Sequence, residues 1–193
     1  METKSVEKEG LSKQVYEILD DIGETPEREG LEETWKRRVP DMLQELTEGY
    51  SEEEKPDMTS FTSDKQEMVV KQNIPFYSLC EHHMIPFFGQ VHLAYKPDGE
   101  IVGLSKLIRY VRWRSRKLLT QERLTDEIAN GLEEELNAKG VIVKVEAEHL
   151  CESMRGVETQ GTQTTTLSKT GVFEEIENEQ RFFNLIGGEN ESN

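Results

Sequence analysis

Two short clusters hold most of the residues in this sequence that could bind a metal ion or transfer protons. The first is CEHH at residues 80–83, and the second is HLC at residues 149–151. The chain has only two cysteines and four histidines, so both cysteines and three of the histidines fall in these clusters. Thiolate sulfur combined with imidazole nitrogen is a ligand set that selects zinc. If the two clusters meet in the fold, they can form a metal site and leave further histidines that are not needed as ligands.

The spacing of the first cluster suits a metal ion. Cys80 and His83 have C-x2-H spacing, which lets one turn offer a sulfur and a nitrogen to one ion, and Cys151 would be the third ligand. Three protein ligands leave one tetrahedral position open, as in catalytic zinc sites, where bound zinc lowers the pKa of water to about 7. A pairing of Cys80 with His82 is also possible on spacing alone. For any one of these residues taken singly, an unconnected buried side chain is the alternative.

His82 and His149 remain for proton transfer. Histidine titrates near neutral pH, and a positioned one contributes roughly 10²–10⁴-fold to a rate as a general acid or base. The alternative for His149 is a hydrogen-bonded core histidine. His92 lies on a predicted strand with no partner nearby in the sequence, so we interpret it as structural.

The charge distribution predicts an anionic small-molecule ligand. The formal net charge is -16, and residues 1–60 hold 18 acidic against 8 basic residues, which argues against general nucleic-acid binding. Residues 101–121 contain no acid at all. The basic residues of this stretch are Lys106, Arg109, Arg112, Arg114, Arg116 and Lys117.

Within the basic stretch, Ser105 lies at the start of a predicted helix, where free backbone N–H groups favour phosphate. Lys106 and Arg109 are i and i+3 and so share a helix face. Arg155, shortly after Cys151, adds another guanidinium near the predicted metal ligands. The alternative is an ordinary solvated basic face.

Gln121 and Glu122 stand together at the start of the next predicted helix. A buried carboxylate that accepts two N–H bonds is a natural reader of a guanine edge. From spacing alone, the ordinary placement of an acid in the first turn of a helix is the favoured interpretation.

The periodicity of residues 67–193 predicts an α+β domain, with strands at 68–74, 87–95, 141–151 and 163–173. Two helices lie between the strand pairs, one from near Ser105 and one from about Glu122 that Gly140 would end as its C′ residue. Hairpins at both ends favour an antiparallel four-stranded sheet, ββααββ, with both helices on one face. In strand 141–151, His149 and Cys151 would point to the buried side, about 7 Å apart.

Residues 1–66 predict a helical extension and an acidic linker. Apolar residues at helical spacing cover 11–22 and 31–46, Pro40 should break or kink the second helix, and 51–63 reads as a polar linker. A frayed tail is expected from Gly187 onward.

The composition favours a cytoplasmic protein. No apolar run approaches the ~20 residues needed to span a bilayer, and the first ten residues have no apolar region typical of a signal peptide. Two cysteines in this length do not make a disulfide scaffold, which fits a reducing compartment.

Taken together, these motifs resemble GTP cyclohydrolase I, the zinc enzyme family that opens the pterin pathway. The resemblance rests on CEHH at 80–83, GLSK at 103–106, QERLT at 121–125, and HLC at 149–151 followed by MRG at 154–156. Their order and separations match the family, and coverage is nearly continuous from about Met68 to Ile186.

The resemblance implies a tunnelling fold, in which the sheets of several subunits join into a barrel, typically in a homodecamer with active sites at subunit interfaces. It implies zinc on Cys80, His83 and Cys151, with His82 and His149 as acid–base catalysts. It further implies a set of substrate contacts for GTP: Ser105, Lys106, Arg109 and Arg155 on the triphosphate, and Gln121 and Glu122 on guanine.

The reaction it implies begins with water attack at C8, opens the imidazole ring, releases formate and gives 7,8-dihydroneopterin triphosphate. Two rivals stand beside it. One is the deazaguanine nitrile reductase of the same fold, against which the Cys/His clusters argue. The other is a zinc-stabilised nucleotide-binding protein without turnover.

Overall fold

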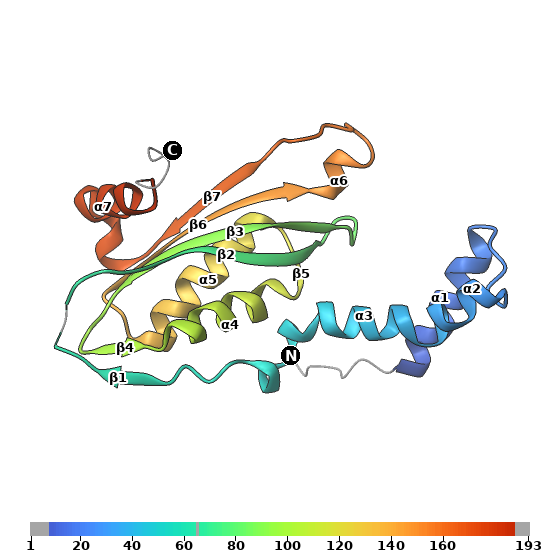
Figure 1. Cartoon of the computed structure of the whole chain (residues 1–193), viewed down its shortest axis with the longest axis horizontal. Helices are drawn as coiled ribbons and strands as arrows, with labels where there is room; N and C mark the ends of the chain where they lie inside the picture. Colours follow the sequence, from blue (N-terminus) through green and yellow to red (C-terminus); the bar gives the residue numbers. More distant parts are fainter. Residues whose placement is uncertain (1–7, 65, 188–193) are drawn as a thin grey trace, which may run out of the picture.

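The centre of the fold is a five-stranded sheet in the order β5-β2-β3-β6-β7 (Figure 1). The computed structural model describes residues 8–64 and 66–187. The tail predicted from Gly187 onward lies outside the described residues except for Gly187 itself, which is the last residue of a helix. The strands are β2 (Val69–Cys80), β3 (Pro86–Lys96), β5 (Leu118–Leu119), β6 (Gly140–His149) and β7 (Thr164–Lys169). The four long strands pair antiparallel with their neighbours, which confirms the predicted α+β class.

The sheet differs from the predicted ββααββ arrangement by one strand. β5 pairs parallel with the end of β2, where Leu118 lies opposite Leu79 and Leu119 opposite Cys80. A two-residue strand shows no alternation, and its partner lies far earlier in the chain, so the sequence gives no local signal for it. The short β4 (Glu100–Val102) stays outside the main sheet and pairs with β1 (Ser60–Thr62).

Two helices cover one face of the sheet, as predicted. They are α4 (Leu104–Ser115) and α5 (Gln121–Leu136), and both lie on the same side of the strands in Figure 1. The odd residues of β6, such as Val143 and Val145, are fully buried in the core on that side. Ile142 points the other way, into a smaller cluster with Phe173 and Phe182. Phe182 belongs to α7 (Ile176–Gly187), which therefore covers part of the opposite face.

The end of α5 corrects one prediction. Asn137, at φ 45°, takes the left-handed position that ends this helix, and Gly140 instead begins β6. A Cβ on Gly140 would lie 2.5 Å from the Thr170 carbonyl oxygen. Glycine is therefore needed there for close packing between segments rather than for helix capping.

The N-terminal helices pack on one another and extend away from the sheet (Figure 1). They are α1 (Lys8–Asp21), α2 (Glu29–Glu33), the π-helical η1 (Thr34–Arg38) and α3 (Val39–Leu46). The π-helical turn ends at Arg38, two residues before Pro40, which lacks the N–H that would continue a regular helix. The predicted disturbance at Pro40 is therefore present. Within the described residues, none of the helices is both long and apolar enough to cross a membrane.

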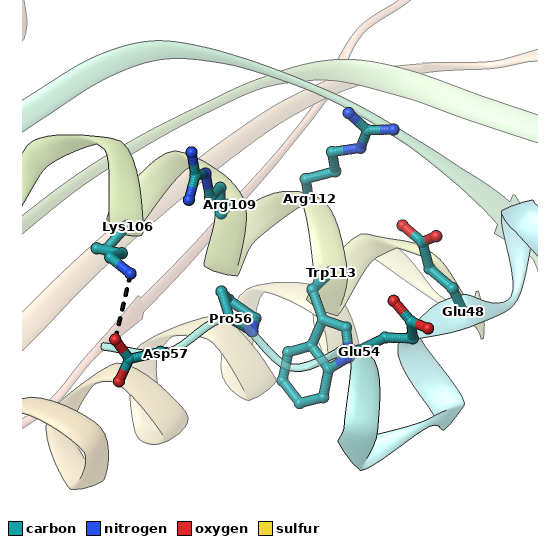
Figure 2. A pocket seen from close by; sticks show the side chains of 8 residues that line it. All are labelled: Glu48, Glu54, Pro56, Asp57, Lys106, Arg109, Arg112 and Trp113. Carbon is teal, nitrogen blue, oxygen red and sulfur yellow. Dashed lines mark hydrogen bonds and ion pairs between the residues drawn. The ribbon is translucent and has the colours of Figure 1, made fainter. Parts of the chain in front are cut away.

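The segment predicted as a polar linker is structured. After η2 (Glu48–Tyr50), it forms the 3-10 turn η3 (Glu52–Glu54) and β1, and it lies along α4. The Trp113 indole N–H donates to the Ser51 carbonyl oxygen at 3.1 Å. Lys106 pairs with Asp57 at 3.3 Å (Figure 2). These contacts join the segment to residues about 50 to 60 positions later in the chain. The local composition carries no sign of them, and it therefore indicated a linker.

Gly89 offers a test of the close contact between β3 and β6. A Cβ there would lie 1.9 Å from the Glu146 carbonyl oxygen and 2.8 Å from the Ala147 Cα, both rigid backbone atoms. We expect Gly89→Ala to force the strands apart and to lower the free energy of unfolding by about 1–3 kcal/mol. Urea denaturation measures the change. Gly10→Ala, where nothing lies within 4 Å of the added carbon, is the control, and equal effects of the two substitutions would contradict the packing argument.

His92 should make stability depend on pH. It is buried, and its Nε2 lies 3.2 Å from the Glu146 carboxylate. Burial lowers the pKa of His92 below its ordinary value, opposed by Glu146 and assisted by Lys144. The unfolded chain therefore binds more protons, so the contribution of His92 is complete above about pH 6.5 and is lost as pH falls through its folded pKa. Denaturation curves of His92→Gln should lose less stability between pH 7.5 and 5.5 than the wild type, and parallel losses would refute this.

Candidate metal and nucleotide site

The turn after β2 holds the first two predicted metal ligands. Cys80 is the last residue of β2, and its backbone N–H donates to the Ile85 carbonyl oxygen at 3.0 Å. The Met84 N–H donates back to the Cys80 carbonyl oxygen at 2.8 Å, and Met84 takes a positive φ of 55°. This tight turn brings His83 over Cys80, with Nδ1 of the ring 3.9 Å from Sγ.

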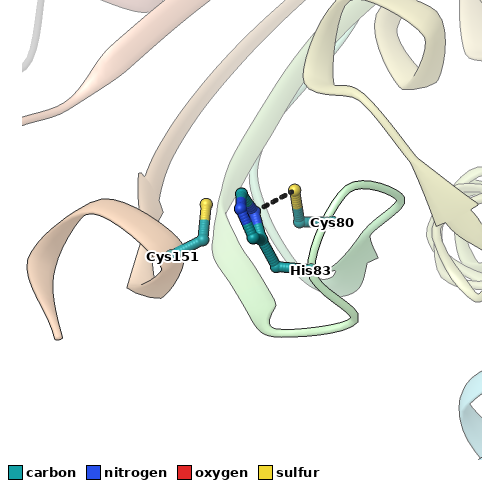
Figure 3. A group of neighbouring side chains, drawn as sticks. All are labelled: Cys80, His83 and Cys151. Carbon is teal, nitrogen blue, oxygen red and sulfur yellow. Dashed lines mark hydrogen bonds between the residues drawn. The ribbon is translucent and has the colours of Figure 1, made fainter. Parts of the chain in front are cut away.

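Cys151 completes the group from another element. The prediction that it continues the strand is wrong, because β6 ends at His149 and Cys151 lies in the short helix α6 (Leu150–Ser153). The turn into α6 carries its thiol toward the other two ligands, and the ligand atoms of Cys80, His83 and Cys151 lie within 4.8 Å of one another (Figure 3). Zinc bonds of about 2.3 Å to sulfur and 2.0–2.1 Å to nitrogen fit such a triangle.

The chemistry of the two thiols also fits a cation. Burial raises the pKa of the Cys151 thiol, and the neighbouring Cys80 sulfur raises it further. A cation between them would remove this penalty, because zinc binds thiolates and deprotonates them. The arrangement therefore favours ligation over two independent core cysteines.

His82 lies near the same sulfur but outside the group. Its Nδ1 is 3.8 Å from the Cys80 Sγ, its Nε2 is 3.9 Å from Glu81, and its side chain is 64% exposed. The alternative pairing of Cys80 with His82 is not favoured, because the group of mutually close ligand atoms contains His83 and Cys151 with Cys80 and does not include His82. The geometry leaves His82 available for another role.

His149 is held between an aromatic face and an amide. It lies opposite Phe87 in the β3–β6 ladder, and the two rings stack with centroids 4.8 Å apart and planes 1° from parallel. Its Nε2 is 2.8 Å from the Gln121 side-chain oxygen. Burial lowers the pKa of His149 below its ordinary value, while the charges of Glu152 and Glu122 oppose that shift. A histidine that is neutral at physiological pH suits proton exchange.

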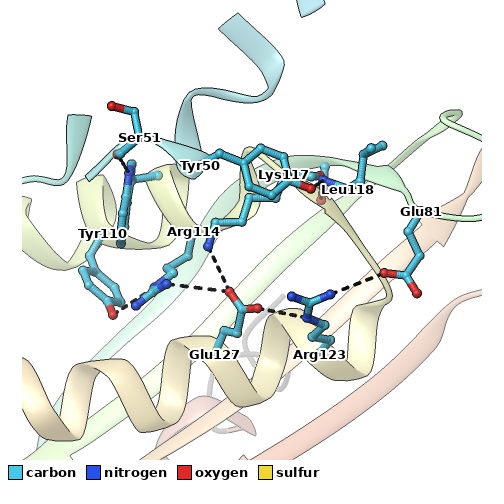
Figure 4. A network of polar contacts seen from close by, with 11 residues as sticks. Tyr50, Ser51, Glu81, Tyr110, Arg114, Lys117, Leu118, Arg123 and Glu127 are labelled. Carbon is cyan, nitrogen blue, oxygen red and sulfur yellow. Dashed lines mark hydrogen bonds and ion pairs between the residues drawn. The ribbon is translucent and has the colours of Figure 1, made fainter. Parts of the chain in front are cut away.

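A chain of ion pairs ties the metal turn to α5. Glu81 lies 3.7 Å from Arg123, and the Nε of Arg123 donates to Glu127 at 3.0 Å (Figure 4). Glu127 also pairs with Lys117 at 3.1 Å and with Arg114 at 3.7 Å. Arg114 of α4 and Lys117 just after it are thus paired inside the protomer, which argues against the solvated basic face that was the alternative for these residues.

The predicted substrate residues fall into two distant groups. Gln121 is buried and Glu122 exposed at the start of α5, beside His149, while Arg155 is exposed just beyond α6. The start of α4 lies next to β4, at the opposite end of the sheet from the metal turn (Figure 1). β3 has 11 residues and connects those ends, a span of about 35 Å at ~3.4 Å per residue.

The distant group borders a pocket of about 260 Å³ (Figure 2). Ser105 is exposed nearby at the start of α4. The residues that line the pocket are Glu48, Glu54, Pro56, Asp57, Lys106, Arg109, Arg112 and Trp113. Basic side chains from α4 thus face acidic side chains from the segment that precedes β1.

Three of the contacts around the site have no signal in the sequence. The stacking of Phe87 on His149 depends on the register of β3 and β6. The ion pair between Glu81 and Arg123 depends on how the metal turn meets α5. The burial of Gln121 depends on β7, whose Thr166 contacts it. All three need the tertiary structure.

Comparison with known proteins identifies the family to which this chain belongs. The profile described as GTP cyclohydrolase I matches residues 11–187. The GTP cyclohydrolase 1 of Streptococcus thermophilus is 46% identical over 175 residues, which cover 90% of this chain and 93% of that protein. The GTP cyclohydrolase 1 of Aquifex aeolicus is 46% identical over 187 residues, covering 95% and 99%. An archaeosine synthase QueF-Like crystal structure in the apo form superposes with a TM-score of 0.45 and 15% identity, covering 56% of this chain and 97% of that one. By its sequence over nearly the whole described chain, this protein belongs to the GTP cyclohydrolase I family.

Proposed function

We propose that this chain acts as a zinc-dependent GTP cyclohydrolase I, converting GTP into formate and 7,8-dihydroneopterin triphosphate. The observation that carries the proposal is the meeting of Cys80, His83 and Cys151 from two separate elements, next to an unliganded histidine. Family membership supports the activity. We place the catalytic domain at residues 67–193. We also propose that the protein is cytoplasmic, a compartment supported by its two free cysteines.

The proposed division of work follows from the geometry. Cys80, His83 and Cys151 would hold zinc, which in such sites acts as a Lewis acid and lowers the pKa of water to about 7. His149, fixed against Phe87, takes up and returns protons during opening of the imidazole ring. His82, exposed beside the same turn, is the second acid–base group.

Guanine recognition falls to the start of α5. Glu122 is exposed in the first turn of that helix, next to the buried Gln121 and close enough to His149 for their charges to interact. Its carboxylate can accept two N–H bonds from a guanine edge, and only a purine that offers both donors satisfies it. In this pose the base lies beside His149.

The triphosphate residues support a site shared between protomers. Lys106 and Arg109 line a pocket at the far end of the sheet from Cys80. One GTP molecule cannot bridge the length of β3, so the phosphates bound beside one metal centre would contact α4 of a neighbouring chain, with Ser105 and Arg155 completing the set. This supports a homo-oligomer, and we propose the decameric tunnelling fold of the resemblance.

Turnover is the direct test. We expect purified protein with zinc to release formate from GTP and to yield a fluorescent pterin after oxidation, because the ligand triangle and His149 are both in place. A chelator should abolish product, and added zinc should restore it. GTP binding without product in the zinc-loaded protein would favour the rival nucleotide-binding protein instead.

Two substitutions separate ligand from acid–base roles. Cys151→Ala should lose both zinc and turnover, because one of the three ligands is removed. His149→Ala should keep zinc while turnover falls by roughly 10²–10⁴-fold. Metal content and product formation are measured on each variant, and His92→Gln, a histidine change outside the site, should keep both. Equal zinc depletion in the Cys151 and His149 variants would overturn this assignment.

A further inference from the structure

Gln121 has a buried polar side chain beside the site, at 1% exposure. We propose that Gln121 is a positioning residue: it holds His149 as the Nε2–H tautomer, so that protons pass through Nδ1 of that ring. The catalytic part of this inference rests on the proposed function, while the hydrogen-bond part is independent of it.

The amide nitrogen of Gln121 is surrounded by acceptors. Its Nε2 donates to the carbonyl oxygens of Thr164 at 2.9 Å and Val145 at 3.1 Å, and lies 3.1 Å from the Thr166 hydroxyl. These partners come from β6 and β7, so the side chain is inserted into the layer between α5 and the sheet. A buried amide in this layer is stable only when its groups are bonded.

These partners fix which way the amide faces. Backbone carbonyls can only accept, so the group that faces Thr164 and Val145 must be the NH₂. Turned over, the amide would place its oxygen against two carbonyl oxygens and leave its N–H groups facing the imidazole. The observed orientation is therefore the one the surroundings allow.

The neighbouring hydroxyls agree with this orientation. Thr125 donates its proton to the Gln121 backbone carbonyl at 2.7 Å. The Thr166 hydroxyl, 2.6 Å from that of Thr125, must then donate to Thr125. Its lone pair can then share one of the two Gln121 amide hydrogens with the carbonyl oxygens, so every hydroxyl proton in the cluster has a destination.

The orientation of the amide determines the tautomer of His149. The Gln121 oxygen has no proton, so at 2.8 Å the Nε2 of His149 must carry one. In the neutral ring the lone pair is then on Nδ1. No described residue forms a hydrogen bond with Nδ1, and this atom is not among the buried polar atoms without partners, so it is open for exchange.

Two contacts together define the position of the ring. The parallel Phe87 ring, 4.8 Å away, fixes the plane of the imidazole. The bond to Gln121 fixes its rotation within that plane. This is the arrangement by which an orienting group sets a general base, with the amide in the role of the third member.

The inference assigns Gln121 a different task from the guanine contact expected from the sequence. Each polar atom of its side chain already has a protein partner, so guanine recognition would fall to Glu122 and nearby backbone groups. Loss of Gln121 should then reduce the catalytic rate constant more than the affinity for GTP.

The first test needs no change at Gln121. The zinc-loaded protein, labelled with ¹⁵N-histidine, is measured by solid-state NMR, and the His149 signals are identified by their absence in His149→Gln. We expect a protonated Nε2 and an unprotonated Nδ1 for the neutral ring. The opposite tautomer would overturn the proposal.

The second test is Gln121→Met, which keeps the length of the side chain and removes each of its hydrogen bonds. We expect kcat to fall at least ten-fold, but by no more than the roughly 10²–10⁴-fold that the acid–base group itself contributes. KM should change less than three-fold, and the His149 tautomer signal should be altered. The control is Ser115→Ala, which removes another buried hydrogen bond, at 2.9 Å to Arg112 in α4, away from the site. It should leave activity and the tautomer unchanged.

The outcomes separate the two proposals. A large rise in KM with kcat preserved would assign Gln121 to guanine binding and refute positioning. The expected tautomer in a protein that never releases formate would uphold the hydrogen-bond part and refute the proposed function. Active protein with the opposite tautomer would uphold the proposed function and refute the hydrogen-bond part of the inference.

Discussion

The pairing of β3 with β6 is the constraint on which the site depends. Its register places Phe87 opposite His149 and ends β6 where the chain turns into α6. That turn carries Cys151 toward the ligands at the end of β2. A shift of one residue in the register would point His149 to the other face of the sheet and separate it from the metal group. The absence of a side chain at Gly89, in the same ladder, permits the close approach of the strands.

Charge is organised by the same framework. The chain has a net charge of -16, yet α4 and the residues that follow it are free of acids. Part of this positive charge is neutralised within the protomer, where Glu127 pairs with Arg114 and Lys117. Lys106 and Arg109 instead face a pocket, with Asp57 as the ion-pair partner of the lysine. If the proposed triphosphate site is correct, an incoming polyphosphate would have to displace that carboxylate, so the segment before β1 would directly influence its binding.

The sequence predicted the elements well where a signal was local. Alternating residues gave β6, helical spacing gave α4 and α5, and the clustering of rare cysteines and histidines gave the metal group. It failed where contacts between distant segments decide the structure. β5 is too short to show a pattern, the segment 51–63 is ordered by α4 and Trp113, and Asn137 rather than Gly140 ends α5 because Gly140 is needed against Thr170. The position of Cys151 was misjudged because alternation alone does not show where a strand ends.

The candidate site combines exposed residues on a turn with a histidine that the core holds rigidly. His82 and His83 lie on a turn at the surface of the protomer, where a ligand can reach them, and a cation bound with Cys80 and Cys151 would hold His83 in place. His149 needs no ligand to be held, because its ring is stacked on a core phenylalanine and bonded to a buried amide. Burying that amide would destabilise the fold unless β6 and β7 supplied acceptors, which they do. The sheet that forms the core therefore also orients His149, the proposed proton-transfer group, so that substitutions in the neighbouring strands would alter the proposed chemistry without touching substrate.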